Sequence, residues 1–217
     1  MEILPSLISG DILNLENTIK LLSDHCDGFH IDIMDDHFVP NLTWGPAFVN
    51  GIMQKTNLPL HIHLMVDNPV TWVDRIKLRQ NDLFIFHIEA ALDFPEVEDI
   101  ISDVKKIGWK VGIAIKPKTE VTHLFDFLTS LDHVLIMSVN PGFSGQKFMP
   151  EVIKKIEPLI KKRKEMHLGF TIGFDGGIDT TNIKSLANFG VDQFGVASAV
   201  FGHPDPVKAL QDLYNAK

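Results

Sequence analysis

Eight short runs rich in β-branched and aromatic residues recur along this chain, and longer stretches separate them. Alternation of this kind is typical of repeated βα units around a parallel sheet. The units recur about every 25 to 30 residues, with a longer sixth one, which predicts a (β/α)8 barrel. The predicted strands are Ile3 to Ser6, Phe29 to Ile33, Leu60 to Met65, Leu83 to Ile88, Lys110 to Ile115, His133 to Met137, Gly169 to Phe174 and Gln193 to Val196.

The chain of 217 residues shows no shift in composition and no Ser/Pro-rich linker. Its length fits one α/β barrel, so we expect residues 1–217 to form a single catalytic domain of the TIM-barrel class. An open doubly wound sheet remains the alternative, because strand patterns alone do not reveal whether a sheet closes. Eight regular units favour closure.

The stretches between the strands carry apolar residues at three- and four-residue steps, which predicts amphipathic helices. Two clear examples begin at Leu15 and at Glu151. Pro158 lies inside the second, so a kink or break is expected there. The basic cluster from Lys161 to Lys164 ends this stretch, where positive charge complements the helix dipole. We interpret it as a solvated helix end and not as a nucleic-acid contact.

The net charge of -8 argues against a protein that coats nucleic acid, although a phosphate can still be held by backbone amides. The single cysteine, Cys26, excludes an internal disulfide and is compatible with a reducing compartment. The N-terminus lacks a basic region and is interrupted by Pro5 and Gly10, unlike a secretory signal. Since no apolar run approaches the roughly 20 residues that span a bilayer, we expect a cytoplasmic protein with no membrane partner.

Polar side chains gather at the C-terminal ends of the predicted strands, where the active sites of such barrels lie. His30, Asp32 and Met34 stand two residues apart and therefore share one face of the second strand. His63 lies near the end of the third strand, and Asp175 follows the seventh. A lone residue of this kind is more often structural. Two imidazoles and two carboxylates that converge from three strands predict a site for Zn, Fe(II), Mn or Co.

Glycine-containing loops follow three consecutive strands, at 140–146, 175–177 and 195–198. Loops at these positions form the phosphate site of many such barrels, because glycine lets backbone N–H groups approach phosphate oxygens. Tight turns also require glycine without any ligand, but three such loops in a row favour a phosphate. The candidate contacts are Gly142, Phe143, Ser144, Gly145, Gly176, Gly177, Ala197 and Ser198.

Six stretches in this order resemble the ribulose-phosphate 3-epimerase family over essentially the whole chain. They are PSLISGD from Pro5, FHIDIMDDHFVPNLTWGP from Phe29, HLMV from His63, MSVNPGFSGQKF from Met137, FDGGI from Phe174 and VASAVFG from Val196. The resemblance implies that His30, Asp32, His63 and Asp175 hold one divalent metal ion. It also implies that Ser6 and His63 contact the substrate and that Met34, Met65 and Met137 line the site, although methionine is more often a core gap-filler.

The family's reaction interconverts D-ribulose 5-phosphate and D-xylulose 5-phosphate, a step of the pentose phosphate pathway. It removes the proton at C3, forms an enediolate and returns a proton to the opposite face. Asp32 and Asp175 come from distant strands and can serve as the paired base and acid. A metal ion would polarise the ketone and stabilise the enediolate. The resemblance also implies a homo-oligomer.

Three residues, Asp36, Ser144 and Ala197, stand where the family usually has glycine. They put substrate affinity and substrate choice in doubt more than the type of reaction. The alternatives are a 3-epimerase for a six-carbon ketose phosphate such as allulose 6-phosphate, and a non-catalytic phosphosugar-binding relative. A decarboxylase or aldol-type lyase fits less well, because Lys116 is the only obvious lysine at a strand end.

Overall fold

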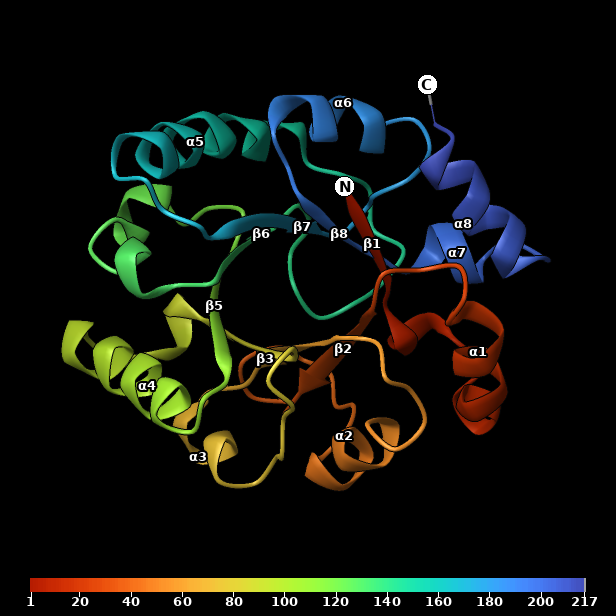
Figure 1. Ribbon diagram of the computed structural model, residues 1–217, viewed down its shortest axis with the longest axis horizontal. Helices are drawn as coiled ribbons and strands as arrows, with labels where there is room; N and C mark the ends of the chain where they lie inside the picture. Colours follow the sequence, from red (N-terminus) through yellow and green to blue (C-terminus); the bar gives the residue numbers. More distant parts are fainter. Residues whose placement is uncertain (217) are drawn as a thin grey trace.

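The protein, described here by a computed structural model over residues 1–216, is built around eight parallel strands. The strands lie in the order β1-β8-β7-β6-β5-β4-β3-β2, and an isolated parallel bridge between Ser6 and His30 joins the two ends of the sheet. Figure 1 shows the ring with its helices outside. The strands are β1 Glu2–Pro5, β2 Phe29–Met34, β3 Leu60–Met65, β4 Leu83–His87, β5 Lys110–Ile115, β6 His133–Met137, β7 Thr171–Asp175 and β8 Gln193–Val196.

This arrangement confirms the predicted (β/α)8 barrel and excludes the open doubly wound sheet, because β1 and β2 meet. The α-helices are α1 Leu15–Leu22, α2 Pro46–Ile52, α3 Val70–Val73, α4 Phe94–Lys106, α5 Ile156–Glu165, α6 Ile183–Phe189, α7 Ser198–Phe201 and α8 Pro206–Tyr214. Among the residues described, none of the helices has the length and apolar character needed to cross a membrane.

The fifth βα unit differs from the regular pattern, because two 3-10 helices, Val121–Leu124 and Leu128–Ser130, stand between β5 and β6 in place of an α-helix. Val121, Leu124 and Phe127 are buried and stand three residues apart. This spacing matches the three-residue turn of a 3-10 helix, so the segment covers the barrel with a tighter coil.

The break expected near Pro158 lies slightly earlier in the chain. A 3-10 helix spans Pro150–Lys155, and α5 begins at Ile156, so Pro158 occupies the first turn of α5. Proline is tolerated there, since the first backbone N–H groups of a helix have no partner within the helix. The proline therefore marks a helix start and not a kink within a helix.

Alternation along the strands separates two environments. On β2, Phe29, Ile31 and Ile33 are buried in the main hydrophobic core. The residues between them, His30 and Asp32, belong to a polar cluster inside the barrel. Because successive side chains of a strand point to opposite faces, one strand both anchors the helical layer and carries polar groups into the interior. His30 and Asp32 are thereby held on the backbone of a buried strand.

Candidate active site

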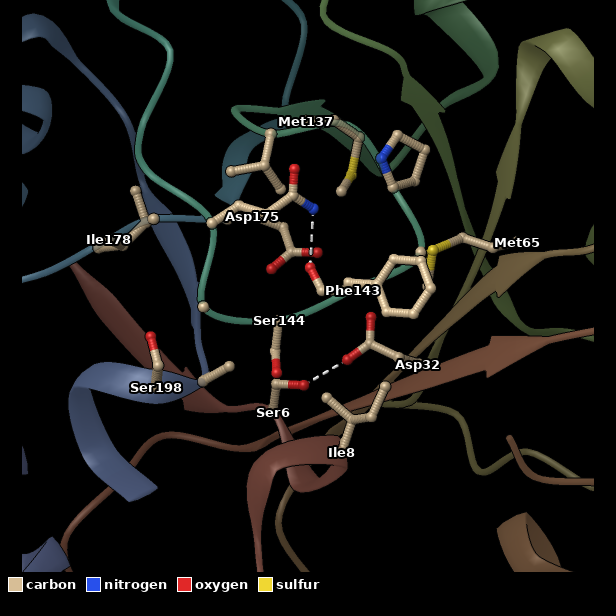
Figure 2. Close-up of a pocket in the computed structure, with 18 of the residues that line it drawn as sticks. Ser6, Ile8, Asp32, Met65, Met137, Phe143, Ser144, Asp175, Ile178 and Ser198 are labelled. Carbon is tan, nitrogen blue, oxygen red and sulfur yellow. Dashed lines mark hydrogen bonds between the residues drawn. The ribbon is translucent and has the colours of Figure 1, made fainter. Parts of the chain in front are cut away.

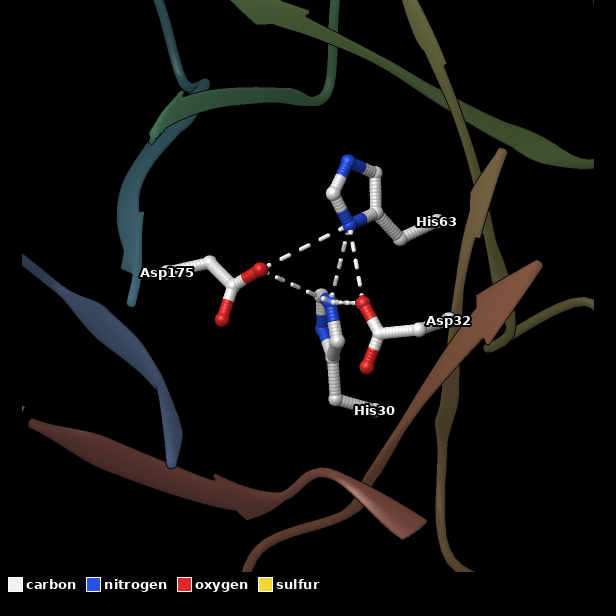
Figure 3. Close-up of side chains that lie close together, drawn as sticks. All are labelled: His30, Asp32, His63 and Asp175. Carbon is white, nitrogen blue, oxygen red and sulfur yellow. Dashed lines mark hydrogen bonds and ion pairs between the residues drawn. The ribbon is translucent and has the colours of Figure 1, made fainter. Parts of the chain in front are cut away.

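Four side chains from β2, β3 and β7 converge inside the barrel (Figure 3). His30 lies near the start of β2, level with His61 of β3, and not at the C-terminal end of the strand. The Nδ1 atom of His63 lies 3.2 Å from Oδ1 of Asp32 and 3.6 Å from Oδ2 of Asp175. The Nε2 atom of His30 lies 3.3 Å from Oδ1 of Asp32 and 3.7 Å from Oδ2 of Asp175. The sequence-predicted set His30, Asp32, His63 and Asp175 is thus one cluster, which we call the His/Asp cluster.

The spacing of these atoms fits a metal ion. Bonds of about 2.1 Å to nitrogen and oxygen ligands place neighbouring atoms of a tetrahedral site about 3.4 Å apart. One candidate atom from each of the four residues lies within 4.8 Å of all the others, and all four residues are buried. Two imidazoles and two carboxylates form a mixed donor set that suits Zn, Fe(II), Mn or Co. The cluster can therefore bind a divalent metal ion.

The two carboxylates of the cluster differ in acidity. Burial alone would raise the pKa of Asp32, but the neighbouring His30 and His63 rings more than offset this and hold that pKa well below its usual value. Burial, together with the charge of Asp32, raises the pKa of Asp175 to about 7. Without a metal ion, Asp32 is therefore ionised at neutral pH, whereas Asp175 holds or releases a proton near pH 7.

The two histidines of the cluster also differ. Burial tends to lower the pKa of His30, but the charges of Asp32 and Asp175 prevail and raise it to about 9. For His63, burial prevails and lowers the pKa to about 3. The His63 ring is therefore neutral at physiological pH, which is the form that binds metal ions.

Hydrogen bonds fix the strand ends that carry the cluster. The Thr43 hydroxyl donates to the backbone carbonyl of Asp32 at 2.7 Å and accepts from the backbone N–H of Met34 at 2.9 Å. The Ser138 hydroxyl donates to the backbone carbonyl of Asp175 at 2.9 Å. The side chain of Ser6 donates to Oδ2 of Asp32, the oxygen that faces away from the histidines. The backbone of both aspartates is thus held in place, and so is one oxygen of the Asp32 carboxylate.

A cavity of about 510 Å³, its open mouth included, lies beside the cluster. Figure 2 shows Asp32 and Asp175 facing this cavity, and the loop with Phe143 and Ser144 borders it. His30 and His63 are not among its lining residues. The predicted site residues that line it are Ser6, Asp32, Met34, Met65, Met137, Gly142, Phe143, Ser144, Gly145, Asp175, Gly176, Gly177, Ala197 and Ser198.

The three methionines form an apolar part of the cavity wall. Met34, Met65 and Met137 come from β2, β3 and β6, and all are almost fully buried. Met34 and Met65 pack together with Val39 in a small hydrophobic cluster. They are therefore core residues that also line the cavity, and their role toward a substrate stays a prediction.

Backbone geometry explains the glycines after β7. Gly176 has φ +107°, and a Cβ atom there would lie 2.3 Å from a methyl carbon of Val139. Gly177 has φ +64°, and a Cβ atom there would lie 2.4 Å from the backbone nitrogen of Phe148. Both residues are thus required by the turn itself. Their presence alone does not identify a phosphate site.

Free backbone donors do point to an anion. In the part of the chain that the structure describes, no acceptor is in hydrogen-bonding range of the N–H groups of Gly177, Ala197 and Ser198. All three residues line the cavity, and Ser198 begins α7. N–H groups without a partner beside a cavity are suited to phosphate oxygens.

The three departures from the family pattern have different structural settings. Asp36 has φ +60°, in the left-handed region that favours glycine and that aspartate tolerates better than most residues. Its side chain is exposed, and it is not among the residues that line the cavity. Ala197 has φ -106° and needs no glycine. Ser144 is exposed on the loop beside the cavity. Only Ala197 and Ser144 therefore face the predicted ligand.

Sequence reasoning missed two groups of residues. The cavity is also lined by Ile8, Val139 and Ile178, which lie beside predicted site residues in the chain, and by Pro141 and Gln146 of the predicted loop 140–146. Behind the cluster, His87 contacts His63 with 2.9 Å between their Nε2 atoms. Alternation along β4 puts His87 on the same face as Ile85, so the period of two could have placed it inside the barrel.

The whole length of the chain matches known proteins. The model of the "Ribulose-phosphate 3 epimerase family" covers residues 2–201. The chain is 37% identical to the ribulose-phosphate 3-epimerase of Mycobacterium tuberculosis, over 97% of this chain and 90% of that protein. It is 35% identical to the enzyme of the same name from Bacillus subtilis, over 100% of both.

The chain belongs to the ribulose-phosphate 3-epimerase family. The resemblance seen in the sequence is thereby confirmed, and with it the prediction of an epimerase. Solved structures support the fold alone. KGPDC from Streptococcus mutans in complex with D-R5P aligns with a TM-score of 0.76 at 13% identity, over 99% of this chain and 96% of that chain.

Proposed function

We propose that this protein interconverts D-ribulose 5-phosphate and D-xylulose 5-phosphate by moving the proton at C3. The observation that carries the proposal is the His/Asp cluster, whose two carboxylates face one cavity in a chain of the epimerase family. Inversion at C3 needs a base on one face of the substrate and an acid on the other. Asp32 on β2 and Asp175 at the end of β7 supply such a pair from separate strands.

Each of the two carboxylates has one oxygen for a metal ion and a second oxygen for proton transfer. Oδ1 of Asp32 and Oδ2 of Asp175 face the two histidines, so these oxygens are the ones suited to a metal ion. Oδ2 of Asp32 accepts from Ser6, and Oδ1 of Asp175 lies beside Gly195, where a Cβ atom would come within 2.9 Å. Each aspartate can thus bind metal through one oxygen and exchange a proton through the other.

The two carboxylates can take opposite roles in the proton transfer. Ionised Asp32 can take the C3 proton, while Asp175 can return a proton to the opposite face. The roles reverse for the reverse reaction. A divalent metal ion held by the cluster would act as a Lewis acid and stabilise negative charge on the substrate oxygens. His30 and His63 orient the carboxylates, and Met34, Met65 and Met137 keep water away.

Proton exchange at C3 tests this proposal directly. In deuterated water, the protein is expected to introduce deuterium at C3 of ribulose 5-phosphate. Asp175→Asn should lower kcat by about 100- to 10,000-fold, because the side chain can no longer carry the proton. Asp36→Asn is the matched control, since Asp36 is exposed and lies outside the cavity lining. Near-normal turnover by Asp175→Asn would contradict the assignment, and absent exchange would favour a phosphosugar-binding protein without activity.

The phosphate is proposed to bind at the opposite end of the cavity from Asp32, against Gly177, Ala197 and Ser198. Their free N–H groups and the Ser198 hydroxyl support this position. Comparison of kcat/KM for ribulose 5-phosphate and allulose 6-phosphate decides between a five-carbon and a six-carbon substrate. The lyase alternative finds no support, since Lys116 is not among the residues that line the cavity.

We propose Zn, Fe(II), Mn or Co as the metal, on the basis of the mixed nitrogen and oxygen donors. Activity of metal-stripped protein, reloaded with each ion in turn, identifies it.

We further propose that residues 1–217 act as one catalytic domain, as a homo-oligomer and in the cytoplasm. The exposed side chains of Leu13 and Leu92 are compatible with subunit contacts. Light scattering during gel filtration measures the oligomeric state.

A further inference from the structure

A row of side chains leads from His63 of the His/Asp cluster, through His87, to Glu89, away from the substrate cavity. The Nε2 atom of His63 points away from the other three cluster residues (Figure 3), and it lies 2.9 Å from Nε2 of His87. The Nδ1 atom of His87 lies 3.0 Å from Oε2 of Glu89. Neither His87 nor Glu89 lines the cavity. These two residues therefore reach the site only through His63.

The ring of His63 must hold its proton on a particular nitrogen. Its Nδ1 atom faces both aspartates, so a metal ion there requires a lone pair on Nδ1. A neutral imidazole then carries its proton on Nε2. This proton must be donated to Nε2 of His87, which in turn must carry its own proton on Nδ1. That second proton is donated to Glu89.

Glu89, at the end of the row, fixes the direction of these hydrogen bonds. Glu89 is ionised, since its pKa falls to about 2: burial alone would raise it, but the bond with His87 and the donors Thr119 and Lys116 more than offset burial. Its Oε1 atom accepts from the backbone N–H of Lys116 at 2.7 Å and from the hydroxyl of Thr119. Oε2 is left for His87. An ionised carboxylate can only accept, so the His87 Nδ1 atom must donate.

We propose that Glu89 and His87 are positioning residues that hold His63 in the tautomer able to bind the metal ion. The inference rests on the proposed metal site, because it assigns the metal-facing nitrogen of His63. Neighbouring groups that receive the second N–H of a metal-binding histidine fix its tautomer and increase its basicity. Here the effect passes through one additional imidazole before it reaches a carboxylate.

The variant Glu89→Gln reverses the direction of the hydrogen bonds along the row, while the shape of the side chain is kept. The backbone N–H of Lys116 can only donate, so it holds the amide oxygen of the new side chain in the position of Oε1. The amide NH2 group then faces Nδ1 of His87, which must accept. The His87 proton moves to Nε2, and the His63 proton is forced onto Nδ1. The metal-facing lone pair is lost, while every contact in the row remains hydrogen-bonded.

Zinc affinity, measured by competition with a chelator, tests the inference. Glu89→Gln is expected to bind zinc about 10- to 100-fold more weakly than the unchanged protein, the usual cost of altering an outer-shell partner. Thr119→Val is the matched control, because it removes a donor to the same carboxylate but leaves the carboxylate in place. It should bind zinc nearly as tightly as the unchanged protein. In the metal-free protein, Asp32 competes for the His63 proton at Nδ1, so nitrogen-15 shifts of the ring should show more of the proton on Nε2 in the unchanged protein than in Glu89→Gln.

A second variant guards against misfolding of the first. His87→Phe keeps a ring of similar shape but offers no acceptor for the His63 proton, and its zinc affinity should fall in the same direction. Equal zinc affinity of Glu89→Gln and the unchanged protein, both folded, would overturn the inference and leave the proposed function intact. Failure of the unchanged protein to bind zinc, manganese, cobalt or iron(II) would overturn the metal site and this inference together.

Discussion

The interior of the barrel holds two pairs of histidines with different chemistry. The upper pair, His30 and His63, lies beside Asp32 and Asp175, with ring centres 5.2 Å apart. The lower pair, His61 and His133, lies nearer the N-terminal ends of β3 and β6, with ring centres 5.4 Å apart. All four side chains are buried. The two pairs are therefore alike in residue type, spacing and burial.

Neighbouring carboxylates distinguish the upper pair of histidines from the lower pair. Asp32 and Asp175 face the upper pair and raise the pKa of His30 to about 9, against the effect of burial. The lower pair has no such neighbour: burial lowers the pKa of His133 to about 3, and the Nδ1 atom of this ring bonds only the hydroxyl of Thr171, at 2.8 Å. Within residues 1–216, only the upper group brings three or more possible ligands together. Paired carboxylates, and not buried histidines, thus define the site.

Removal of one histidine from each pair should give the largest difference between the pairs, in the affinity for metal. His63→Ala removes one of the four proposed ligands, so metal affinity should fall by more than the roughly 10- to 100-fold that loss of an outer-shell partner costs. His61→Ala lies on the same strand, two residues away, and should leave the metal content unchanged. Metal content of both purified proteins, checked for folding by circular dichroism, measures the difference. Equal metal loss in the two variants would mean that the lower pair also holds metal.

The upper and the lower pair, with their neighbours, should also differ in the number of protons released when metal binds. Asp175, with a pKa of about 7, and His30, with a pKa of about 9, both hold protons in the metal-free protein at pH 6. A metal ion must displace these protons, so we expect about two to be released at pH 6 and about one at pH 8. Affinity should therefore fall as pH drops, by about tenfold per unit for each proton. The histidines of the lower pair are neutral in this range and should release none.

Calorimetry in buffers of different ionisation enthalpy counts these protons. The same titration of Asp175→Asn provides the control, because the amide has no proton to lose and only the His30 contribution remains. Identical proton numbers at pH 6 and pH 8 for the unchanged protein would contradict the raised pKa of Asp175.

The sequence predicted the strands well, because each buried strand is a short apolar run that ends before polar or glycine-rich residues. It also predicted the four members of the His/Asp cluster, since side chains two residues apart on β2 must share a face. The repeat pattern favoured barrel closure without establishing it, because the bridge between Ser6 and His30 joins residues from neighbouring units at a point that periodicity does not encode.

Other features depend on distances that a sequence does not contain. The opposite acidity of Asp32 and Asp175 follows from unequal approach of the histidines and from burial. The contact of His87 with His63 depends on the register between β3 and β4. The fifth unit showed its three-residue apolar spacing in the sequence, but that pattern also fits part of an amphipathic helix.

The smallest effect is expected at the lower pair, from His133→Phe. The Nε2 atom of His133 is buried without a hydrogen-bond partner, and an unpaired polar atom of this kind costs about 1 to 3 kcal/mol. Phenylalanine removes this cost but also removes the bond to Thr171, worth about 1 kcal/mol. The Thr171 hydroxyl can still donate to Oε1 of Gln193 at 3.3 Å, so it keeps a hydrogen-bond partner. The slightly larger ring must also fit beside Gly173. These opposing contributions should leave the free energy of unfolding within about 1 kcal/mol of the original value, as measured by urea titration.

Metal affinity and turnover of His133→Phe should not change. A marked loss of metal affinity in this folded variant would show that the lower histidines support the upper ones through the barrel interior, and the distinction between the two pairs would then fail.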